Sequence, residues 1–411
     1  MDKIKTQIMQ TDKYYKFGYN TFGPLLWGYS HWLIDNLKKE GINKVYFFSR
    51  DGYIMLKAFN LIRGNEDFQK HYLEVSRRSL RVPILWKDCS IENLMTMLAP
   101  SNLISIKSIF DGIGLSIHNY KHLIEKYGFT EESVFYRNVM LQNEHLKRML
   151  EELKNDITSN SKKEFDNLKK YLQQNNVYGK FAIVDIGWSG GMQRFLQTTL
   201  KELGIENEIH GYYTGVASFY KRNTTSNKLK LNGYLFDFSK NESDIDLRSS
   251  YVGLYELLFL EAKGSVKKYY ENESGQMLAE RYPYEYSEGG KDMKEVQLIS
   301  IVQKAALDFI SNKEKENCDV PSKMELCSPL IKAGSYPTKE AISLFADFHF
   351  YDEGVYNLLA HPKSLLYYIF HPNSFKKDLY LSRWKTGFLY RLFKLPISYQ
   401  MLYNLLKRYS N

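Results

Sequence analysis

Three carboxylates in apolar surroundings are the strongest candidates for chemistry in the 411-residue sequence. Asp51 and Asp185 each lie at the end of a short apolar run, and Glu256 lies inside the apolar stretch LYELLFLEA. A carboxylate inside an apolar stretch, such as Glu256, is either paired or functional, because burying a bare charge is costly. Each of the three could act as the general base that accepts a proton from an attacking hydroxyl group, and the sequence does not rank them.

Groups that bind anions lie beside two of these carboxylates. Arg50 can hold a phosphate through two hydrogen bonds, and Gly52 lets the backbone approach a ligand. After Asp185, a turn rich in glycine opens a helix, and its N–H groups together with the positive helix end favour an anion. The candidate phosphate-binding residues of this turn are Gly187, Trp188, Ser189, Gly190, Gly191 and Gln193. The alternatives are an Arg50–Asp51 ion pair that caps a helix, and a tight strand-to-helix turn with no ligand.

A third cationic group ends another apolar run. Ser76 and Arg77 are candidate phosphate-binding residues there, followed by Arg78 and Arg81, although an arginine pair is often a solvated face. The turn after Asp185 fits neither GxGxxG nor GxxxxGK[ST], so neither a dinucleotide nor a P-loop nucleotide is indicated.

Short apolar runs predict the strands that would position these side chains. The runs at 45–49, 71–75, 180–186 and 210–216 alternate with segments of helical periodicity, the first of them at 22–37. This pattern is typical of an α/β fold with a mostly parallel, Rossmann-like sheet. Because ligands bind at the carboxyl ends of such strands, we expect the candidate residues at one edge of the sheet.

The predicted organisation has three parts. Residues 1–270 are expected to form an α/β catalytic domain with a helical insertion at about 90–174, and residues 271–374 a helical subdomain. Residues 375–411 form a basic, amphipathic C-terminal tail, with eight basic residues against Asp378 alone. The tail is predicted to bind an anionic membrane surface. The alternative is a helical hairpin packed on the body, and Pro396 divides the tail into two helices in either case.

Composition excludes several other classes of protein. Cys89, Cys318 and Cys327 are too few and too scattered for a disulfide framework or a zinc site, and no histidine pair has ligand spacing. No apolar run approaches the roughly 18 residues that suggest a membrane span, and the N-terminus lacks the apolar segment of a secretory signal. No interleaved basic and aromatic surface for nucleic acid is evident in the body. We therefore expect a cytoplasmic protein, peripheral at the inner face of the membrane, with no nucleic-acid partner.

The order of these motifs resembles a known family. Gly23-Pro24, YFFSRDGY, Ser76-Arg77-Arg78, VDIGWSGGMQ, GYYTG and YELLFLEAKGSV follow one another along the chain. Together they resemble the C-terminal, glycan phosphoribosyltransferase domain of two-domain bacterial ribofuranosyltransferases from polysaccharide clusters, which are often labelled haloacid-dehalogenase-like hydrolases. The resemblance covers roughly residues 14–270, and a weaker similarity is found at residues 336–352.

The resemblance implies a glycosyltransferase of surface-polysaccharide biosynthesis, such as that of capsule or O-antigen. The donor would be phosphoribosyl pyrophosphate with Mg²⁺, and the acceptor a lipid-linked glycan. The pyrophosphate would bring the metal, with Asp185 as a possible ligand and no other protein ligand indicated. The phosphatase domain of the family is not in this sequence. We therefore expect that a separate phosphatase acts, that the 5-phosphate stays, or that the donor differs.

Two alternative functions remain. A nucleotide-sugar or other phospho-sugar transferase could use the DxD pattern Asp244-Ile245-Asp246, but its polar surroundings predict a surface loop instead. The same surroundings argue against a phosphatase nucleophile. A non-catalytic scaffold of a polysaccharide assembly complex is the other alternative.

Overall fold

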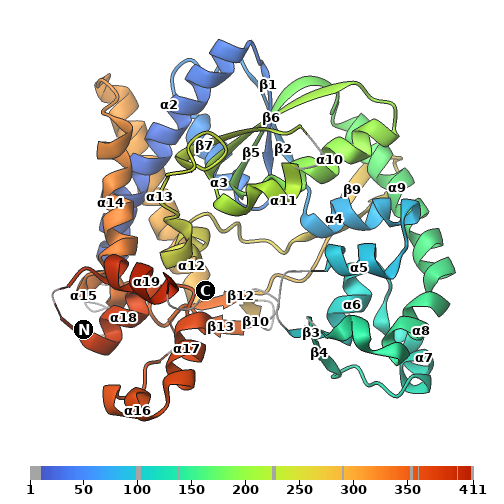
Figure 1. The fold of residues 1–411 in the computed structure, drawn as a ribbon. Coiled ribbons are helices and arrows are strands. Elements are labelled where there is room, and N and C mark those ends of the chain that lie inside the picture. Colours follow the sequence, from blue (N-terminus) through green and yellow to red (C-terminus); the bar gives the residue numbers. More distant parts are fainter. Residues whose placement is uncertain are drawn as a thin grey trace.

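A five-stranded sheet forms the centre of the computed structural model, which describes residues 11–408 apart from 99–102, 138, 225–227, 289–290, 352–354, 360 and 396. All neighbouring strands are parallel, in the order β2-β1-β5-β6-β7. The strands are β1 (Lys44–Phe48), β2 (Gln69–Leu73), β5 (Gly179–Trp188), β6 (Asn207–Val216) and β7 (Lys230–Asp237). The predicted α/β fold with a mostly parallel sheet is therefore confirmed (Figure 1).

Helices cover both faces of this sheet. On one face, Phe47 and Val184 pack in a core shared with α2 (Gly23–Glu40), α3 (Gly52–Phe59) and α13 (Lys294–Glu316). On the other face, Phe48 and Ile183 pack against α9 (Lys154–Gln174) and α10 (Gly191–Glu202). Burial on both faces explains why the central strands appear in the sequence as continuous apolar runs.

The insertion between β2 and β5 has a core of its own. It contains α5 (Ile91–Met97), α6 (Ile106–Gly112), α7 (Lys121–Lys126), α8 (Glu144–Glu152) and an antiparallel pair of strands, β3 (Leu103–Ser105) and β4 (Val134–Tyr136). The long helix α9 does not belong to it as a whole, because Leu168 and Leu172 pack on the sheet. The separate insertion therefore ends near the start of α9, earlier than the expected 174.

The C-terminal third of the chain shares the main core. Val302 of α13 and Leu330 of α14 (Lys323–Ser335) are buried in the same core as Val184 of the sheet. Along the chain, β7 is followed by α12 (Arg248–Leu258) and then by the antiparallel pair β8 (Val266–Glu271) and β9 (Met277–Arg281), before α13 begins. The boundary drawn near residue 270 thus does not separate two cores.

The basic C-terminal segment is packed on the body. It forms α17 (Pro372–Leu381), α18 (Lys385–Phe393) and α19 (Tyr399–Arg408), after α15 (Lys339–Phe345), β12 (His349–Tyr351), β13 (Val355–Asn357) and α16 (Leu365–Phe370). Trp384 and Phe388 are fully buried, and the Trp384 indole Nε1 donates a hydrogen bond to the Gly334 carbonyl oxygen at 2.8 Å. This is the packed alternative for the tail. Pro396, expected to divide it, lies outside the described residues, although two separate helices flank that position.

Within the described part of the chain, no helix is long and apolar enough to cross a membrane.

Candidate active site

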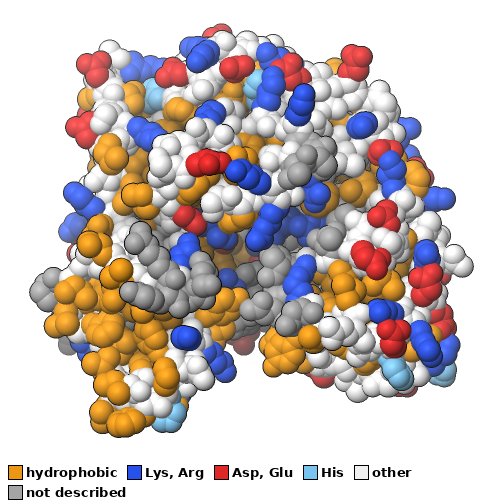
Figure 2. Space-filling view, viewed as in Figure 1, with side chains coloured by type: hydrophobic (Ala, Val, Ile, Leu, Met, Phe, Trp, Pro, Cys, Tyr) orange, Lys and Arg blue, Asp and Glu red, His pale blue; other side chains and the backbone are white. Residues whose placement is uncertain are grey.

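The order of the strands marks one place at the edge of the sheet. From β1 the chain continues to β2 on one side, whereas β5, β6 and β7 follow on the other side. In open parallel sheets the crevice at such a reversal, outside the carboxyl ends of the strands, is where ligands bind. Phe47 pairs with Val184 across this point, so Asp51 and Asp185 leave neighbouring strands at the same edge, as predicted. Figure 2 shows the surface hollowed in this region, with Lys and Arg side chains gathered around the hollow.

The three predicted carboxylates come within electrostatic reach of one another. Asp185 is 7% exposed, and its Oδ1 accepts a hydrogen bond from the Ile186 N–H at 2.9 Å. Asp51 precedes α3, but its side chain makes no capping hydrogen bond to that helix in the described structure. Glu256 extends from α12 and accepts a hydrogen bond from the Trp188 indole Nε1 at 3.0 Å. Because the Asp51 side chain makes no such hydrogen bond, the structure does not support the alternative in which Asp51 only caps α3.

Burial and the negative charges around them raise the pKa of two of these carboxyl groups, Asp51 and Asp185. Desolvation raises the pKa of Asp51 well above its ordinary value, and the charges of Asp185 and Glu256 raise it further. Desolvation also raises the pKa of Asp185 to about 7, although the Ile186 N–H and Arg77 oppose the shift. A carboxyl group that titrates near neutral pH can accept a proton from a hydroxyl group, so the cluster suits general base catalysis.

Arg77 is the available cation of the site. It begins the short helix α4 (Arg77–Arg81) and is exposed, and its guanidinium makes no hydrogen bond or ion pair with any residue that the structure describes. Its charge nevertheless lowers the pKa of both Asp51 and Asp185, which places it close to the carboxylates. An unpaired guanidinium beside a protonated carboxyl cluster is a suitable partner for a phosphate group.

The neighbours of Arg77 hold the backbone in place. The Ser76 hydroxyl accepts a hydrogen bond from the Ser79 N–H at 3.0 Å and donates one to the Val266 carbonyl oxygen at 2.6 Å. Ser76 is thus a helix cap, and its hydroxyl is already engaged with two partners. The predicted phosphate-binding role of Ser76 has no support from this geometry.

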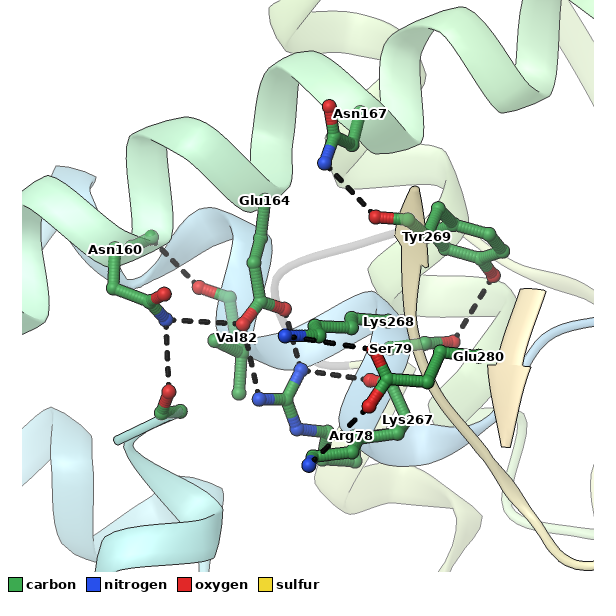
Figure 3. Close-up of polar contacts among 12 residues, drawn as sticks. Arg78, Ser79, Val82, Asn160, Glu164, Asn167, Lys267, Lys268, Tyr269 and Glu280 are labelled. Carbon is green, nitrogen blue, oxygen red and sulfur yellow. Dashed lines mark hydrogen bonds and ion pairs between the residues drawn. The ribbon is translucent and has the colours of Figure 1, made fainter. Parts of the chain in front are cut away.

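Arg78 fixes the orientation of α4. Its two terminal nitrogens bind both carboxylate oxygens of Glu164 on α9, and Nη1 also donates to the Lys267 carbonyl oxygen at 2.7 Å. Figure 3 shows Arg78 between these two elements, with Asn160 donating a further hydrogen bond to Glu164 at 3.0 Å. This buried ion pair connects α4, α9 and β8, and so determines where the adjacent Arg77 lies.

Arg50 already has an anionic partner. Its Nη1 donates hydrogen bonds to Glu285 Oε1 at 2.5 Å and to the Lys263 carbonyl oxygen at 3.2 Å. A phosphate would have to displace Glu285 to bind there. Gly52 is buried at the start of α3, where an added Cβ would lie 3.0 Å from the Phe47 carbonyl carbon. The structure therefore supports backbone packing at Gly52 and an ion pair at Arg50.

The turn after Asp185 presents backbone groups and not side chains. Gly187 has φ +131°, and a Cβ there would lie 2.3 Å from the Gly215 carbonyl oxygen. Gly190 precedes α10 in the left-handed conformation, Gly191 is the first residue of the helix, and no described side chain caps the helix. The Ser189 hydroxyl accepts a hydrogen bond from Asn223 Nδ2 at 2.9 Å. The backbone N–H groups in the first turn of α10 can therefore donate hydrogen bonds to a bound anion.

The amide of Gln193 has partners within the protein. It is fully buried, donates to the Ile209 carbonyl oxygen at 3.1 Å, and accepts a hydrogen bond from the Tyr213 hydroxyl at 2.9 Å. Every contact of its amide is internal to the sheet and α10. The prediction for this residue is corrected to a structural role.

Two residues of the site carry no local signal in the sequence. The Arg248 guanidinium lies over the Trp188 ring, 5.5 Å from its centroid, and Trp188 also stacks on Phe236. Arg248 follows a polar loop and Glu285 lies in another, so neither ends an apolar run. Only the folded chain brings them to the strand ends.

The Asp244-Ile245-Asp246 pattern lies in a surface loop, as predicted. Asp244 Oδ2 accepts the Asp237 N–H at 2.6 Å, Ile245 is 64% exposed, and Asp246 lies 3.7 Å from the Lys407 Nζ. Asp244 therefore stabilises a turn. Two shallow hollows of about 610 and 590 Å³ also lie away from the carboxylates, the first beside Gly179 and Asn207 at the opposite ends of β5 and β6.

The described residues include no group of three or more His, Cys, Asp or Glu side chains arranged to hold a metal ion. No protein-family model matches the chain, and no curated protein matches it either.

Proposed function

We propose that this protein is a glycosyltransferase that moves a phosphoribosyl, or a related pentosyl, group from phosphoribosyl pyrophosphate to a hydroxyl group of a lipid-linked glycan. One observation carries the proposal. The raised pKa values of Asp51 and Asp185, beside the charge of Glu256, occur close to Arg77, whose guanidinium has no partner among the described residues, and to the N-terminus of α10, which no described side chain caps. The site thus combines a base with positions for a pyrophosphate, and the motif order resembles that of the glycan phosphoribosyltransferase domain.

The reaction requires one bond exchange and one proton transfer. The oxygen of the acceptor hydroxyl forms a bond to C1 of the ribose, while the bond from C1 to the pyrophosphate oxygen breaks. Pyrophosphate leaves with the bonding electron pair, and the hydroxyl proton passes to a carboxylate. Asp51 and Asp185 are the bases we propose, because both are near the strand ends and both have raised pKa values, that of Asp185 to about 7.

The remaining groups bind and orient the donor. Arg77 and the first turn of α10 would hold the pyrophosphate, and the aspartate that is not acting as base would accept hydrogen bonds from ribose hydroxyls. Carboxylate and phosphate oxygens suit Mg²⁺, which would arrive with the pyrophosphate and neutralise its charge as it leaves. Glu256 acts by raising the pKa of both aspartates.

The competing donor is a nucleotide sugar. Its DxD motif would have to be Asp244-Ile245-Asp246, but a backbone N–H already occupies Asp244. A non-catalytic scaffold would have no need for a buried carboxylate at pKa about 7. Both alternatives are therefore less well supported than phosphoribosyl transfer.

Turnover tests the proposal. Incubation with phosphoribosyl pyrophosphate, Mg²⁺ and a panel of synthetic glycan acceptors should release pyrophosphate. Asp185→Asn should abolish most of the release, while Asp244→Asn, in the surface loop, should leave it unchanged. Release that depends on Asp244 and not on Asp185 would favour the nucleotide-sugar alternative.

The acceptor implies a location. A glycan that grows on a lipid carrier is presented at a membrane surface, so we propose that the protein is peripheral at the inner face of the membrane. A separate phosphatase would then remove the 5-phosphate where the product lacks it.

A further inference from the structure

Exposed apolar side chains gather in several segments of the described chain, including Leu395, Ile397, Met401 and Leu405 on and before α19, and two of these groups lie on the lobes beside the strand ends. The first, termed the α16 patch, lies on α16 and α17, and its members are between 48% and 72% exposed: Leu365, Leu366, Ile369, Phe370 and Tyr380. The second, termed the hairpin patch, lies on and after the β3–β4 pair, with members between 39% and 65% exposed: Leu103, Val134, Tyr136, Val139 and Leu141. Single exposed apolar residues are ordinary, but groups of this kind mark interaction surfaces.

Both patches lie on the same side of the molecule. In Figure 1, α16 is at the lower end of one lobe and the β3–β4 pair at the inner edge of the other, both below the carboxyl ends of the central strands. Figure 2 shows apolar surface on both lobes and, between and above them, the hollow around which Lys and Arg side chains gather. A flat surface laid against the two lobes would therefore face the entrance to the candidate active site.

The α16 patch is surrounded by positive charge. Lys363, Lys376 and Lys377 are exposed beside it. From residue 355 to the end of the sequence there are nine basic residues, and Asp378 is the only acidic one. The Asp378 carboxylate accepts a hydrogen bond from the Tyr368 hydroxyl at 2.7 Å. Apolar side chains with a rim of lysines match the boundary between acyl chains and anionic headgroups.

We propose that the α16 patch and the hairpin patch together seat the protein on an anionic lipid bilayer. The binding itself is argued from the surface alone. The benefit of the orientation, in which the active-site entrance faces a lipid-linked acceptor, rests on the proposed function.

A bilayer fits this surface better than a protein does. The two patches are at the ends of separate lobes with a hollow between them, whereas a stable protein interface usually covers about 800 Å² of continuous surface on each partner. A bilayer surface can receive two separate patches, because lipids rearrange around each of them. The mixture of Leu, Ile, Phe and Tyr with lysine is also typical of membrane-interface segments.

Only part of the tail at 375–411 belongs to this contact, namely Tyr380 with Lys376 and Lys377. Trp384, Phe388 and Leu389 are fully buried in the main core, so the apolar face of α18 is not available to lipid. The apolar part of the contact therefore comes from α16 and Tyr380, and the exposed Leu395, Ile397, Met401 and Leu405 are the apolar side chains that the rest of the tail leaves accessible. The exposed Lys376 and Lys377 contribute charge.

Vesicle flotation of the full chain tests the proposal. We expect flotation with phosphatidylcholine vesicles that contain phosphatidylglycerol, and little with phosphatidylcholine alone. The double variant Ile369→Ser with Phe370→Ser should lower the partition coefficient roughly tenfold or more, and Val134→Ser with Tyr136→Ser should lower it as well. Lys376→Gln with Lys377→Gln should reduce binding about fivefold for each lysine, and high salt should reduce it in the wild type.

A matched control is Met324→Ser, because Met324 is 69% exposed on α14 and outside both patches. It should float like the wild type. Circular dichroism of each variant would show that the fold is retained, which exposed positions favour. Equal flotation of the wild type and the Ile369/Phe370 variant would overturn the proposal, and so would flotation that is indifferent to phosphatidylglycerol.

Two further measurements separate this proposal from others. With a soluble acceptor, the patch variants should release pyrophosphate at the wild-type rate, so a loss of the enzymatic assignment would leave the flotation result intact. Light scattering should show the same mass for the wild type and the Ile369/Phe370 variant. A wild-type dimer that this variant dissociates would assign the α16 patch to a second copy of the chain and overturn the membrane contact.

Discussion

At the scale of single residues, the site depends on the balance of charge around Asp185. Burial and Glu256 raise the pKa of this carboxyl group, and Arg77 lowers it, with a resulting value of about 7. The ionised form is the base, so activity should fall on the acid side as the carboxyl group takes up a proton. Substitution of either neighbour should move this acid limb, in opposite directions.

Glu256→Gln should shift the acid limb of the kcat/KM profile to lower pH. The substitution removes a negative charge that raises the pKa of Asp185 and Asp51, and keeps an oxygen for the Trp188 indole. A shift of up to about one pH unit is expected. The measurement is pyrophosphate release as a function of pH, and an unchanged limb would remove Glu256 from the cluster.

Arg77→Gln should shift the same limb to higher pH. The positive charge that lowers the pKa of both aspartates is then absent. We also expect KM for the donor to rise roughly tenfold, because a charge-assisted contact to phosphate is lost. Arg148→Gln, an exposed arginine of α8, is the matched control and should change neither quantity.

Asp185→Asn should stabilise the protein while inactivating it. In the wild type, the folded state keeps a proton that the unfolded chain releases, so stability falls as pH rises from about 4 to 7. Asparagine removes this penalty. The free energy of unfolding of the variant, relative to the wild type, should therefore rise by on the order of 2 kcal/mol between pH 5 and pH 8.

Urea denaturation at both pH values measures this effect. Turnover should fall about a hundredfold, which corresponds to on the order of 3 kcal/mol of transition-state stabilisation. A variant that is less stable than the wild type at pH 8 would show that Asp185 is structural.

At the scale of elements, the strands that position the site were the easiest to predict. β1, β5 and β6 are covered on both faces, so their sequences are nearly continuous apolar runs. Strand β7 was not predicted, because Asn232 and Gly233 interrupt its apolar pattern and it lies at the edge of the sheet. The α/β pattern predicts that the carboxyl ends of β1 and β5 lie at the same edge of the sheet. It therefore also predicts that Asp51 and Asp185 come close to each other.

Residues paired across long distances in sequence were beyond prediction. Arg50 meets Glu285, and Arg78 meets Glu164, through contacts that no local pattern encodes. Gln193 was assigned to phosphate because the turn continues into it, whereas helical geometry turns its side chain inward to Tyr213. Charge type therefore indicated the site, but only tertiary contacts distinguish the free Arg77 from its paired neighbours.

The element α18 gives a stability prediction. Trp384→Ala should destabilise the protein by about 3–5 kcal/mol, because a fully buried indole and its hydrogen bond to Gly334 are lost. Leu395→Ala, at a 52% exposed position of the same segment, should cost little. Thermal unfolding compares the two, and similar small losses would contradict the burial of this segment.

At the scale of the whole molecule, the carboxyl ends of the central strands, where the candidate active site lies, are between two lobes. The insertion at α5–α8 lies on one side and the helices α15–α19 on the other, with the strand ends between them (Figure 1). Asp51 and Asp185 follow the strand ends at this space, beside the proposed phosphate-binding groups, and the two exposed apolar patches lie on the lobes. This arrangement suits an enzyme whose donor is soluble and whose acceptor is carried by lipid.

The central claim is that the strand ends bind phosphoribosyl pyrophosphate, and calorimetric titration tests it without knowledge of the acceptor. In the presence of Mg²⁺, the wild type should bind phosphoribosyl pyrophosphate, Arg77→Gln should bind it roughly tenfold more weakly, and Asp244→Asn should bind it like the wild type. A panel of nucleotide sugars should give no comparable heat. Tight, Mg²⁺-dependent binding of a nucleotide sugar, with none of phosphoribosyl pyrophosphate, would contradict the account.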